Sequence, residues 1–596
     1  MKYLLFFMVV MCSGICYSQT TVTFQVNNVE NSKFKYVGIR GGQAPLNWSK
    51  STKMTKTDEG YSVSVTFEED VKTILFKYVL YNSDSKIEWE SIPNRLLRIG
   101  KQSEISVNHR WNKGEAVDVK KLSKIPSDGL MKDFELIKTM ILDVHPGTYR
   151  YADEAKIDSA LEELKRQFKS DLTYGEAYLA ISKVLGAIQC DHTFASFYNQ
   201  SNVVKAVIHE QRDKLPFTFL WIDNKMIVEF DASDASLPKG TEVVSINGYS
   251  STDILNQIMP YAKADGATDK SRVKQIEIDG YPYRHNAFDV FHPLLFPANG
   301  KFELVVNDPD GKTKSLTVLA ITREERSKLL KSRYPEFAYQ KEGLWGYEKI
   351  NESTGIIRAG TFDDYGMDMD WRKYFSTTFK QINQEKIKHL IVDLRKNQGG
   401  FDEIALGLIQ HLVKKEGLVE DFIGKSRYKD FPESLKPYAK SWGDPWFHQM
   451  EVVSAKDSEG YYLLAEENDE VVKPAKNAFK GEIYFLVGPA NVSMAFYLAT
   501  GIKKYNIGTL IGDETGGNQR GINGGQILFL RLPNSKIEID FPVEGSFAKE
   551  ENLPNSGIMP DLEVSTTIAD IRAGRDPQLE AALDLIKEKS GTISGN

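Results

Sequence analysis

The sequence predicts a multidomain protein that combines an all-β part with mixed α/β parts. Three patterns predict this. Short alternating runs fill residues 21–112, apolar residues recur at helical spacing in 125–205, and short apolar strands alternate with helices after about residue 345. At 596 residues the chain is also too long for one hydrophobic core, so three or four domains are expected.

The composition is that of an ordinary globular protein, with 41% hydrophobic and 26% charged residues. The net charge is -7, and the sequence has no strongly basic patch. This argues against nucleic acid or an anionic membrane surface as a partner. Beyond the N-terminus, no apolar stretch is long enough to predict a transmembrane segment.

The first eighteen residues read as a signal peptide. Lys2 precedes an apolar run, Tyr3 to Val10, and small residues stand before a predicted cleavage at Gln19. The sequence therefore predicts an exported protein, periplasmic or secreted. Cleavage would remove Cys12 and Cys16 and leave Cys190 as the only cysteine, which is expected to be a buried small hydrophobe without a disulfide.

Residues 19–113 are predicted to form a β-sandwich, because several alternating runs are separated by turn clusters such as Gly41-Gly42. Trp48 lies in PLNWSKS and Trp89 in IEWESIPNR. These two runs resemble starch-binding carbohydrate modules, and the resemblance implies that both tryptophans stack on sugar rings. The alternative is that the two side chains serve only for packing.

Residues 125–205 are predicted to be helical. Phe134, Ile137 and Ile141 form one apolar face, and His145-Pro146 ends that helix. Further helices are expected at 154–168 and from Leu172-Thr173 onward. The last of these runs into Cys190-Asp191-His192-Thr193, so that His192 follows a helix end and stands beside an acid.

Residues 206–325 change character again. A strand is expected at 242–246, followed by an Asn247-Gly248 turn and a helix from about Ser251, and a hairpin is expected around Asp310-Gly311. The run LPKGTEVVSINGYSSTDIL resembles the PDZ module. The resemblance implies a strand edge that accepts an extended peptide.

Residues 340–590 are predicted to form an α/β domain with parallel pairing. Within it, a buried strand at 483–487 is followed by a tight turn, Ser493 and a helix. A serine at such a junction can expose its hydroxyl beside the free amides of a helix start, which suits a nucleophile. A plain helix N-cap is the other interpretation of Ser493.

Several motifs of this region occur together and in order: IVDLRKNQGG, VGPANVSMAFYLA, IGDETGG and GIMPDLEVSTTIADI. In this order they resemble the C-terminal processing and tricorn-core family of serine peptidases. The runs at His145 and at Cys190 to Thr193 are similar to the helical part of that family. The resemblance covers about residues 125–590 and implies a ClpP/crotonase-like catalytic domain.

The resemblance assigns roles to particular residues. Ser493 is the expected nucleophile, and the oxyanion donors are expected to be the backbone amides of Met494 and of Gly399 or Gly400. The lysine that one branch of the family uses as base is replaced by Asn518. His192 matches the histidine base of the other branch, while Lys503 and Lys504 are less suitable as a solvated pair at a helix end.

A third catalytic residue would orient the imidazole. The glutamate of the tricorn-like pattern is replaced by Pro554, so the sequence leaves Glu551, Glu550, Glu514 and Asp191 as candidates. No histidine or cysteine pair has metal-binding spacing, and no phosphate-binding loop occurs. No metal and no cofactor are expected.

The predicted function is that of an exported serine endopeptidase that hydrolyses peptide bonds with Ser493 and His192. A PDZ-like module would hold the peptide or protein substrate. Two alternatives stay open: a non-catalytic scaffold that binds peptides or glycans, and an esterase that acts on a glycan.

Overall fold

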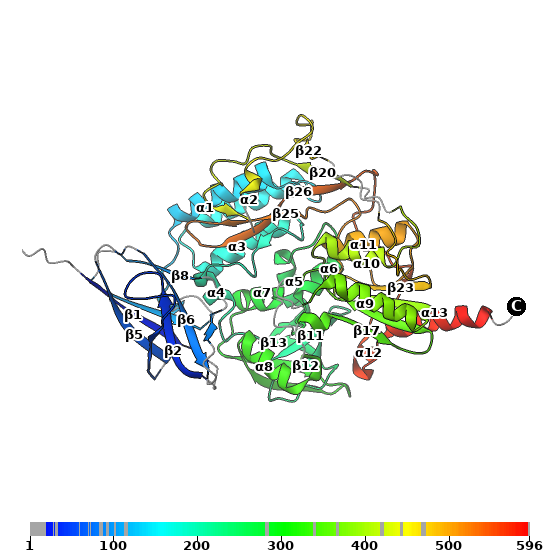
Figure 1. Cartoon of the computed structure of the whole chain (residues 1–596), viewed down its shortest axis with the longest axis horizontal. Helices are drawn as coiled ribbons and strands as arrows, with labels where there is room; N and C mark the ends of the chain where they lie inside the picture. The colour runs from blue at the N-terminus through cyan, green and yellow to red at the C-terminus, as the bar shows by residue number, and fades with distance from the viewer. Residues whose placement is uncertain are drawn as a thin grey trace, which may run out of the picture. The chain divides into compact units, whose positions relative to one another are not determined.

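The computed structural model describes residues 19–593 apart from short gaps, which are 28, 30–33, 59, 69–70, 72, 83–86, 91–93, 100–102, 112–116, 118, 281–284, 338–340, 365–368, 418–421, 442–444 and 466–471. The predicted signal peptide lies outside the described residues. The chain divides into two compact units, Met1–Lys121 and Leu122–Asn596 (Figure 1). No helix of the described residues is both long and apolar enough to cross a bilayer.

The first unit consists mainly of β-strands, which form two sheets. One sheet has the order β4-β5-β1-β9, and the other has the order β3-β2-β6-β7 with β8 paired to β6. The strands are β1 (Thr20–Asn27), β2 (Phe34–Gly41), β3 (Thr52–Lys53), β4 (Thr55–Lys56), β5 (Gly60–Phe67), β6 (Thr73–Asn82), β7 (Ile87–Trp89), β8 (Arg95–Arg98) and β9 (Glu104–Arg110). Inward residues of both sheets, such as Phe24 and Phe76, share one apolar core.

The second unit begins with helices that pack on a sheet built from distant parts of the chain. The helices are α1 (Ser127–Thr139), α2 (Glu154–Phe168), α3 (Tyr174–Ala187) and α4 (Asn202–Ile208). Their sheet has the order β21-β25-β26-β20-β22, with β10 paired to β26. Its strands are β10 (Phe194–Ala195), β20 (Phe422–Ser426), β21 (Ala439–Lys440), β22 (Tyr462–Leu463), β25 (Gly525–Arg531) and β26 (Glu538–Ala548). Residues of α1 to α3 and of β25 and β26 belong to one core, and Figure 1 shows these elements side by side.

A third, largely antiparallel sheet has the order β11-β12-β13-β15-β16, and β14 pairs with β13. Its elements and the helices around it are β11 (Phe217–Ile222), β12 (Lys225–Asp231), β13 (Glu242–Ile246), β14 (Tyr249–Ser250), α5 (Ser251–Ile258), α6 (Asp269–Ile276), α7 (Ala287–Leu295), β15 (Lys301–Asn307), β16 (Thr313–Leu319) and α8 (Arg323–Arg333). The strand at 242–246, the helix from Ser251 and the hairpin around Asp310-Gly311 are confirmed.

The fourth sheet contains β23, the strand that precedes the predicted nucleophile Ser493. Its order is β17-β18-β19-β23-β24-β27, and all pairs are parallel except β17 with β18. Its elements are β17 (Trp345–Lys349), β18 (Thr354–Ala359), α9 (Trp371–Gln384), β19 (His389–Asp393), α10 (Asp402–Gln410), β23 (Glu482–Val487), α11 (Ser493–Lys504), β24 (Thr509–Gly512), β27 (Leu562–Glu563), α12 (Ile568–Ala573) and α13 (Pro577–Ile593).

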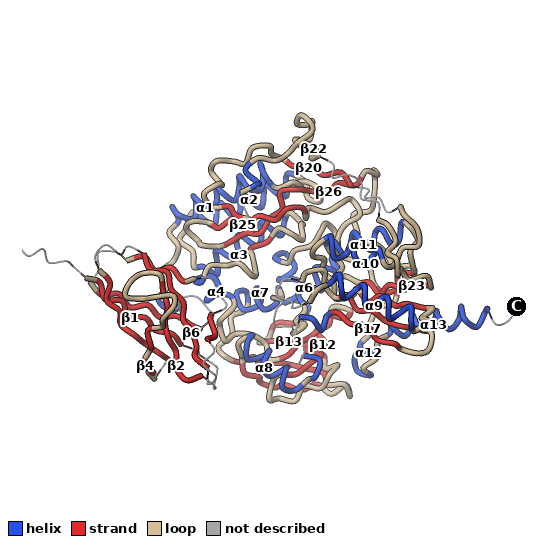
Figure 2. Tube along the Cα trace, in the orientation of Figure 1, coloured by secondary structure: helices blue, strands red, loops and turns tan. Residues whose placement is uncertain are grey.

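Helices cover both faces of this fourth sheet, so its strands are apolar on both sides. Successive strand residues point to opposite faces. Leu390 and Phe485 pack in the core with α9, α10 and α11, whereas Ile391 and Tyr484 pack with α13. The mixed α/β architecture is therefore confirmed. Figure 2 shows the helices around this sheet.

Candidate active site

Ser493 is the first residue of α11, directly after the turn that follows β23. Its φ is 53°, which places a non-glycine residue in the left-handed region. Such a conformation costs free energy and is kept only where the surroundings enforce it, as commonly happens at functional sites. The helix N-cap is Val492 rather than Ser493, so the plain N-cap interpretation of Ser493 is wrong.

Two buried asparagines fix the turn around Ser493. The Asn491 side chain accepts from Gly488 N–H at 2.8 Å and donates to the Leu394 and Asn397 carbonyls at 2.6 and 3.0 Å. The Asn397 side chain donates to the Ala359 carbonyl and accepts from Gly399 N–H, both at 2.8 Å. These amides join the turn before α11 to the loop after β19. Asn491 was not predicted as a site residue from the sequence, although it lies in the motif that contains Ser493, VGPANVSMAFYLA.

Gly399 and Gly400 lie in that loop, against the start of α11. A Cβ on Gly399 would be 2.8 Å from Ser493 Cβ and 2.9 Å from Met494 N, and the φ of Gly399 is 97°. Met494 is the second residue of α11, where a backbone N–H has no acceptor within the helix. Gly399 N–H already donates to Asn397, while the described residues show no hydrogen bond from Gly400 N–H. The structure thus brings Gly399, Ser493 and Met494 together, and Gly400 lines the same cavity as Ser493.

His192 follows α3, beside β25. A Cβ on Gly524 would be 3.0 to 3.3 Å from three atoms of the imidazole, so glycine is needed where the chain passes the ring. Burial lowers the pKa of His192 to about 4, although the neighbouring Asp191 raises it. The imidazole is therefore neutral at neutral pH, and its Nδ1 has no hydrogen-bond partner among the described residues.

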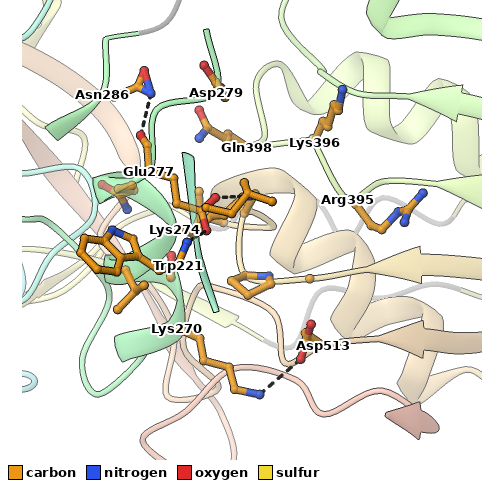
Figure 3. A pocket seen from close by; sticks show the side chains of 18 of the residues that line it. Trp221, Lys270, Lys274, Glu277, Asp279, Asn286, Arg395, Lys396, Gln398 and Asp513 are labelled. Atoms are coloured by element: carbon orange, nitrogen blue, oxygen red, sulfur yellow. Dashed lines mark hydrogen bonds and ion pairs between the residues drawn. The ribbon is translucent and has the colours of Figure 1, made fainter. Parts of the chain in front are cut away.

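Ser493 and His192 line the same cavity, which has a volume of about 1400 Å³. Side chains of α6, of the loop after β19 and of the residues after β24 also line it. Figure 3 shows this cavity, in which Lys270 of α6 reaches Asp513. Their Nζ and Oδ1 atoms are 3.4 Å apart, and this ion pair links α6 to the end of β24.

The two alternative bases lie elsewhere. Lys503 stands at the far end of α11, about 15 Å along the helix axis from Ser493 at 1.5 Å per residue. Its Nζ is 2.6 Å from Asp561 Oδ1 and donates to the Met559 carbonyl. Lys504 is at the same helix end. Asn518 is fully buried and donates to Asn555 at 2.7 Å.

The candidate third residues are engaged in other contacts or exposed. Glu514 Oε1 accepts from Gly557 N–H at 3.0 Å, and Glu550 and Glu551 are exposed. Asp191 is buried beside His192, but its oxygens accept from Lys263 at 3.1 Å and from Gln275 at 2.7 Å. Burial opposes ionisation of Asp191, yet Lys263 holds its pKa below the usual value.

One carboxylate near His192 escaped the sequence analysis. A ring nitrogen of His192, the Cys190 sulfur and a carboxylate oxygen of Asp265 lie within 4.8 Å of one another, the one such group of potential metal ligands among the described residues. Cys190 is buried, as predicted, and donates to the Asn523 carbonyl at 3.5 Å. Because burial raises the pKa of Cys190 to about 12, the thiol stays protonated and is a poor metal ligand in this form.

The two tryptophans of the first unit lie side by side. Their ring centroids are 6.3 Å apart at an interplanar angle of 39°, and the Arg40 guanidinium is 5.1 Å from the Trp89 ring centroid. Trp89 is exposed, whereas Trp48 is half-buried.

A protein-family model matches part of the chain. The model of peptidase family S41 matches residues 353–564. The chain carries a peptidase family S41 domain. This is the family of serine peptidases that the sequence motifs resemble, and the match contains Gly399, Gly400, Ser493 and Met494.

The chain is also similar to a curated protein that is described as a protease subunit. A protein from Sulfurisphaera tokodaii, described as a tricorn-like protease C-terminal subunit, is 28% identical over 284 residues. That match covers 47% of this chain and 26% of the relative, so the chain spans about a quarter of its length.

Solved structures show the fold. Mature CPAF in complex with lactacystin has a TM-score of 0.55 and 13% identity, covering 79% of this chain and 99% of CPAF. A CPAF variant, S499A, has a TM-score of 0.52 and 12% identity, covering 75% of this chain and 95% of that one. The likeness of fold to CPAF therefore extends beyond residues 353–564.

Proposed function

We propose that this chain is a serine endopeptidase with Ser493 as nucleophile and His192 as general base. The observation that carries the proposal is the left-handed backbone of Ser493 at a helix start, next to the free amide of Met494 and on the cavity that His192 lines. A nucleophile, a base and oxyanion donors are the three requirements of acyl transfer.

The proposed reaction proceeds in two steps. Ser493 Oγ attacks the scissile carbonyl carbon and gives its proton to the neutral His192 imidazole. The amides of Met494 and Gly400 stabilise the resulting oxyanion, because Gly399 N–H is already engaged with Asn397. His192 then protonates the leaving amine, and water hydrolyses the acyl-enzyme with His192 again as base.

We further propose that the β11–β16 sheet with α5 acts as a PDZ-like module that holds an extended peptide segment. Its support is that the end of β11, Leu220 to Ile222, lines the same cavity as Ser493. Residues 277–278 already bond to β11 at Phe219 and Trp221, so a substrate would be held beside them rather than in their place. The predicted signal peptide supports export of the chain.

Labelling with a fluorophosphonate tests the catalytic proposal, because this probe reacts with activated serines. We expect the wild type to be labelled and Ser493→Ala and His192→Ala to lose the label. Ser565→Ala and His285→Ala are matched controls, since both residues line the same cavity and have no proposed role. If Ser493→Ala loses the label and His192→Ala keeps it, a residue other than His192 is the base.

An unlabelled wild type would contradict the proposal and favour the non-catalytic scaffold. If labelling succeeds, turnover of peptide substrates should exceed turnover of acyl-sugar esters. The reverse order would favour the glycan esterase.

Binding of starch-like glycans by the first unit is a second candidate function. The exposed Trp89 ring beside Trp48 favours it, because such aromatic pairs offer apolar faces to sugar rings. Two sheets with a shared core would form the predicted sandwich that presents this pair.

A further inference from the structure

A pair of buried polar atoms lies behind His192. His192 Nδ1 and Asp265 Oδ2 are both buried, and neither has a hydrogen-bond partner among the described residues. The two side chains are neighbours, since a ring nitrogen of one and a carboxylate oxygen of the other are within 4.8 Å. Buried polar atoms are rarely left unpaired, because each such atom costs free energy.

The loop before α6 holds Asp265 firmly in this place. Its Oδ1 accepts from Asp191 N–H at 3.0 Å, and the next residue, Gly266, donates its N–H to the Gln189 carbonyl at 3.0 Å. On the other side, Asn518 donates to the Asp265 carbonyl at 3.3 Å. The carboxylate oxygen Oδ1 of Asp265 is therefore held by the segment that contains His192. The other oxygen, Oδ2, stays available to accept a hydrogen bond from the imidazole.

The other carboxylates are less suited to orient the ring. Both oxygens of Asp191 are occupied by Lys263 and Gln275. Glu514 caps the Gly557 amide. Asp265 combines complete burial with one oxygen free of any described partner.

We propose that Asp265 is the residue that positions His192, with Asp265 Oδ2 accepting the hydrogen bond from His192 Nδ1–H. This bond fixes the ring orientation and the tautomer, and it leaves Nε2 free to take the Ser493 proton. Catalytic hydrogen bonds are often long in the unliganded state and tighten when substrate binds. The inference rests on the proposed function, since it needs His192 to act as base.

The charges around the pair agree with this role. Burial raises the pKa of Asp265 to about 7, and Asp191 raises it further, while Asp191 N–H, Lys263 and Arg150 oppose the rise. Above about pH 7 Asp265 is therefore a carboxylate and can accept the Nδ1 proton.

Asp265→Asn in the full chain tests the proposal. Asparagine keeps the shape and the acceptor for Asp191 N–H, but it turns an N–H donor toward the ring and so favours the wrong tautomer. We expect the fluorophosphonate labelling rate to fall about 100-fold or more above pH 7. Asp540→Asn is the matched control, because Asp540 is also a buried aspartate with an unpartnered oxygen and a pKa raised to about 7. This control should label like the wild type.

Stability separates positioning from misfolding. A carboxyl group whose folded pKa is raised contributes stability below its unfolded pKa of about 3.9, and this contribution is lost as the pH rises through about 7. Above pH 7 the Asp265→Asn variant should therefore melt at or above the wild-type temperature while its labelling rate falls. A lower melting temperature with an unchanged labelling rate would overturn the proposal.

A measurement without an Asp265 variant completes the test. Histidine-selective isotope labelling of the wild type should give a downfield Nδ1–H resonance that disappears in His192→Ala. Absence of this resonance above pH 7 would overturn the proposal. The proposal would also be overturned if a chelator abolished fluorophosphonate labelling and Zn²⁺ alone restored it. An unlabelled wild type would instead show that the proposed function itself is wrong.

Discussion

The backbone N–H of Asp191 donates to Asp265 Oδ1 at 3.0 Å, and this bond ties the segment after α3 to the loop before α6. His192, the next residue, is thereby held beside an aspartate that is distant in sequence. The base of the proposed reaction thus depends on contacts between three parts of the chain: the helical segment, the loop before α6, and the start of β25 at Gly524.

The wild-type labelling rate should rise with pH through about 7. Below this pH Asp265 is protonated, so its O–H donates to His192 Nδ1 and the remaining ring proton moves to Nε2, where it blocks the base. His192 itself takes up a proton only near pH 4. The measurement is the labelling rate across this range, and Asp265→Asn should lack the step near pH 7. A single step near pH 4 in the wild type would contradict this account.

Gly399→Ala should strongly reduce the fluorophosphonate labelling rate. The new Cβ would be 2.8 Å from Ser493 Cβ and 2.9 Å from Met494 N, and alanine disfavours a φ of 97°. We expect at least a tenfold loss of labelling rate together with a lower melting temperature, measured on the same preparation. In Gly346→Ala, the control, the added Cβ meets nothing within 4 Å, and labelling should persist. Full labelling of Gly399→Ala would exclude the proposed approach of this loop to Ser493.

Elements with a clear period and a cap could be predicted from sequence. The helix over 154–168 has the predicted bounds, because Asp153 accepts a hydrogen bond from the first turn and one face of the helix is apolar. His145 ends the first helical segment, as predicted, and is fully buried.

The sequence did not predict the sheet that strands of the C-terminal region form with distant parts of the chain. The sequence predicted only an α/β core for 340–590, yet β25 and β26 leave that core and form a sheet under α1 to α3. Pro542 and Gly545 lie within β26, and because both residue types are unfavourable inside strands, the local sequence does not predict this strand. Asp265 was missed for a similar reason, since in the run Ala264 to Thr268 it resembles an ordinary turn residue and only the folded chain places it beside His192.

Ser493→Gly should stabilise the chain relative to Ser493→Ala. Both variants lack the hydroxyl, but only glycine adopts a φ of 53° without strain, which is worth about 1 kcal/mol. The free energies of unfolding of the two variants test this. Ser376 is exposed in the middle of α9 and serves as the control. There Ser376→Gly should be less stable than Ser376→Ala, because glycine costs about 1 kcal/mol in a helix interior. Equal stability of the Ser493 variants would mean that its backbone is unstrained.

Trp89→Ala should weaken binding of soluble starch by the full chain about fivefold, since an aromatic ring stacked on an apolar face contributes on the order of 1 kcal/mol. Trp89 is 40% exposed, and its ring lies beside Trp48 and the Arg40 guanidinium, which together would form the platform for a sugar. Trp446→Ala is the control, because Trp446 is 39% exposed but belongs to the other unit. Affinity electrophoresis in starch gels measures the retardation of each variant. If the wild type is not retarded, or if Trp89→Ala and Trp446→Ala are retarded alike, the tryptophan pair serves packing and the glycan function is excluded.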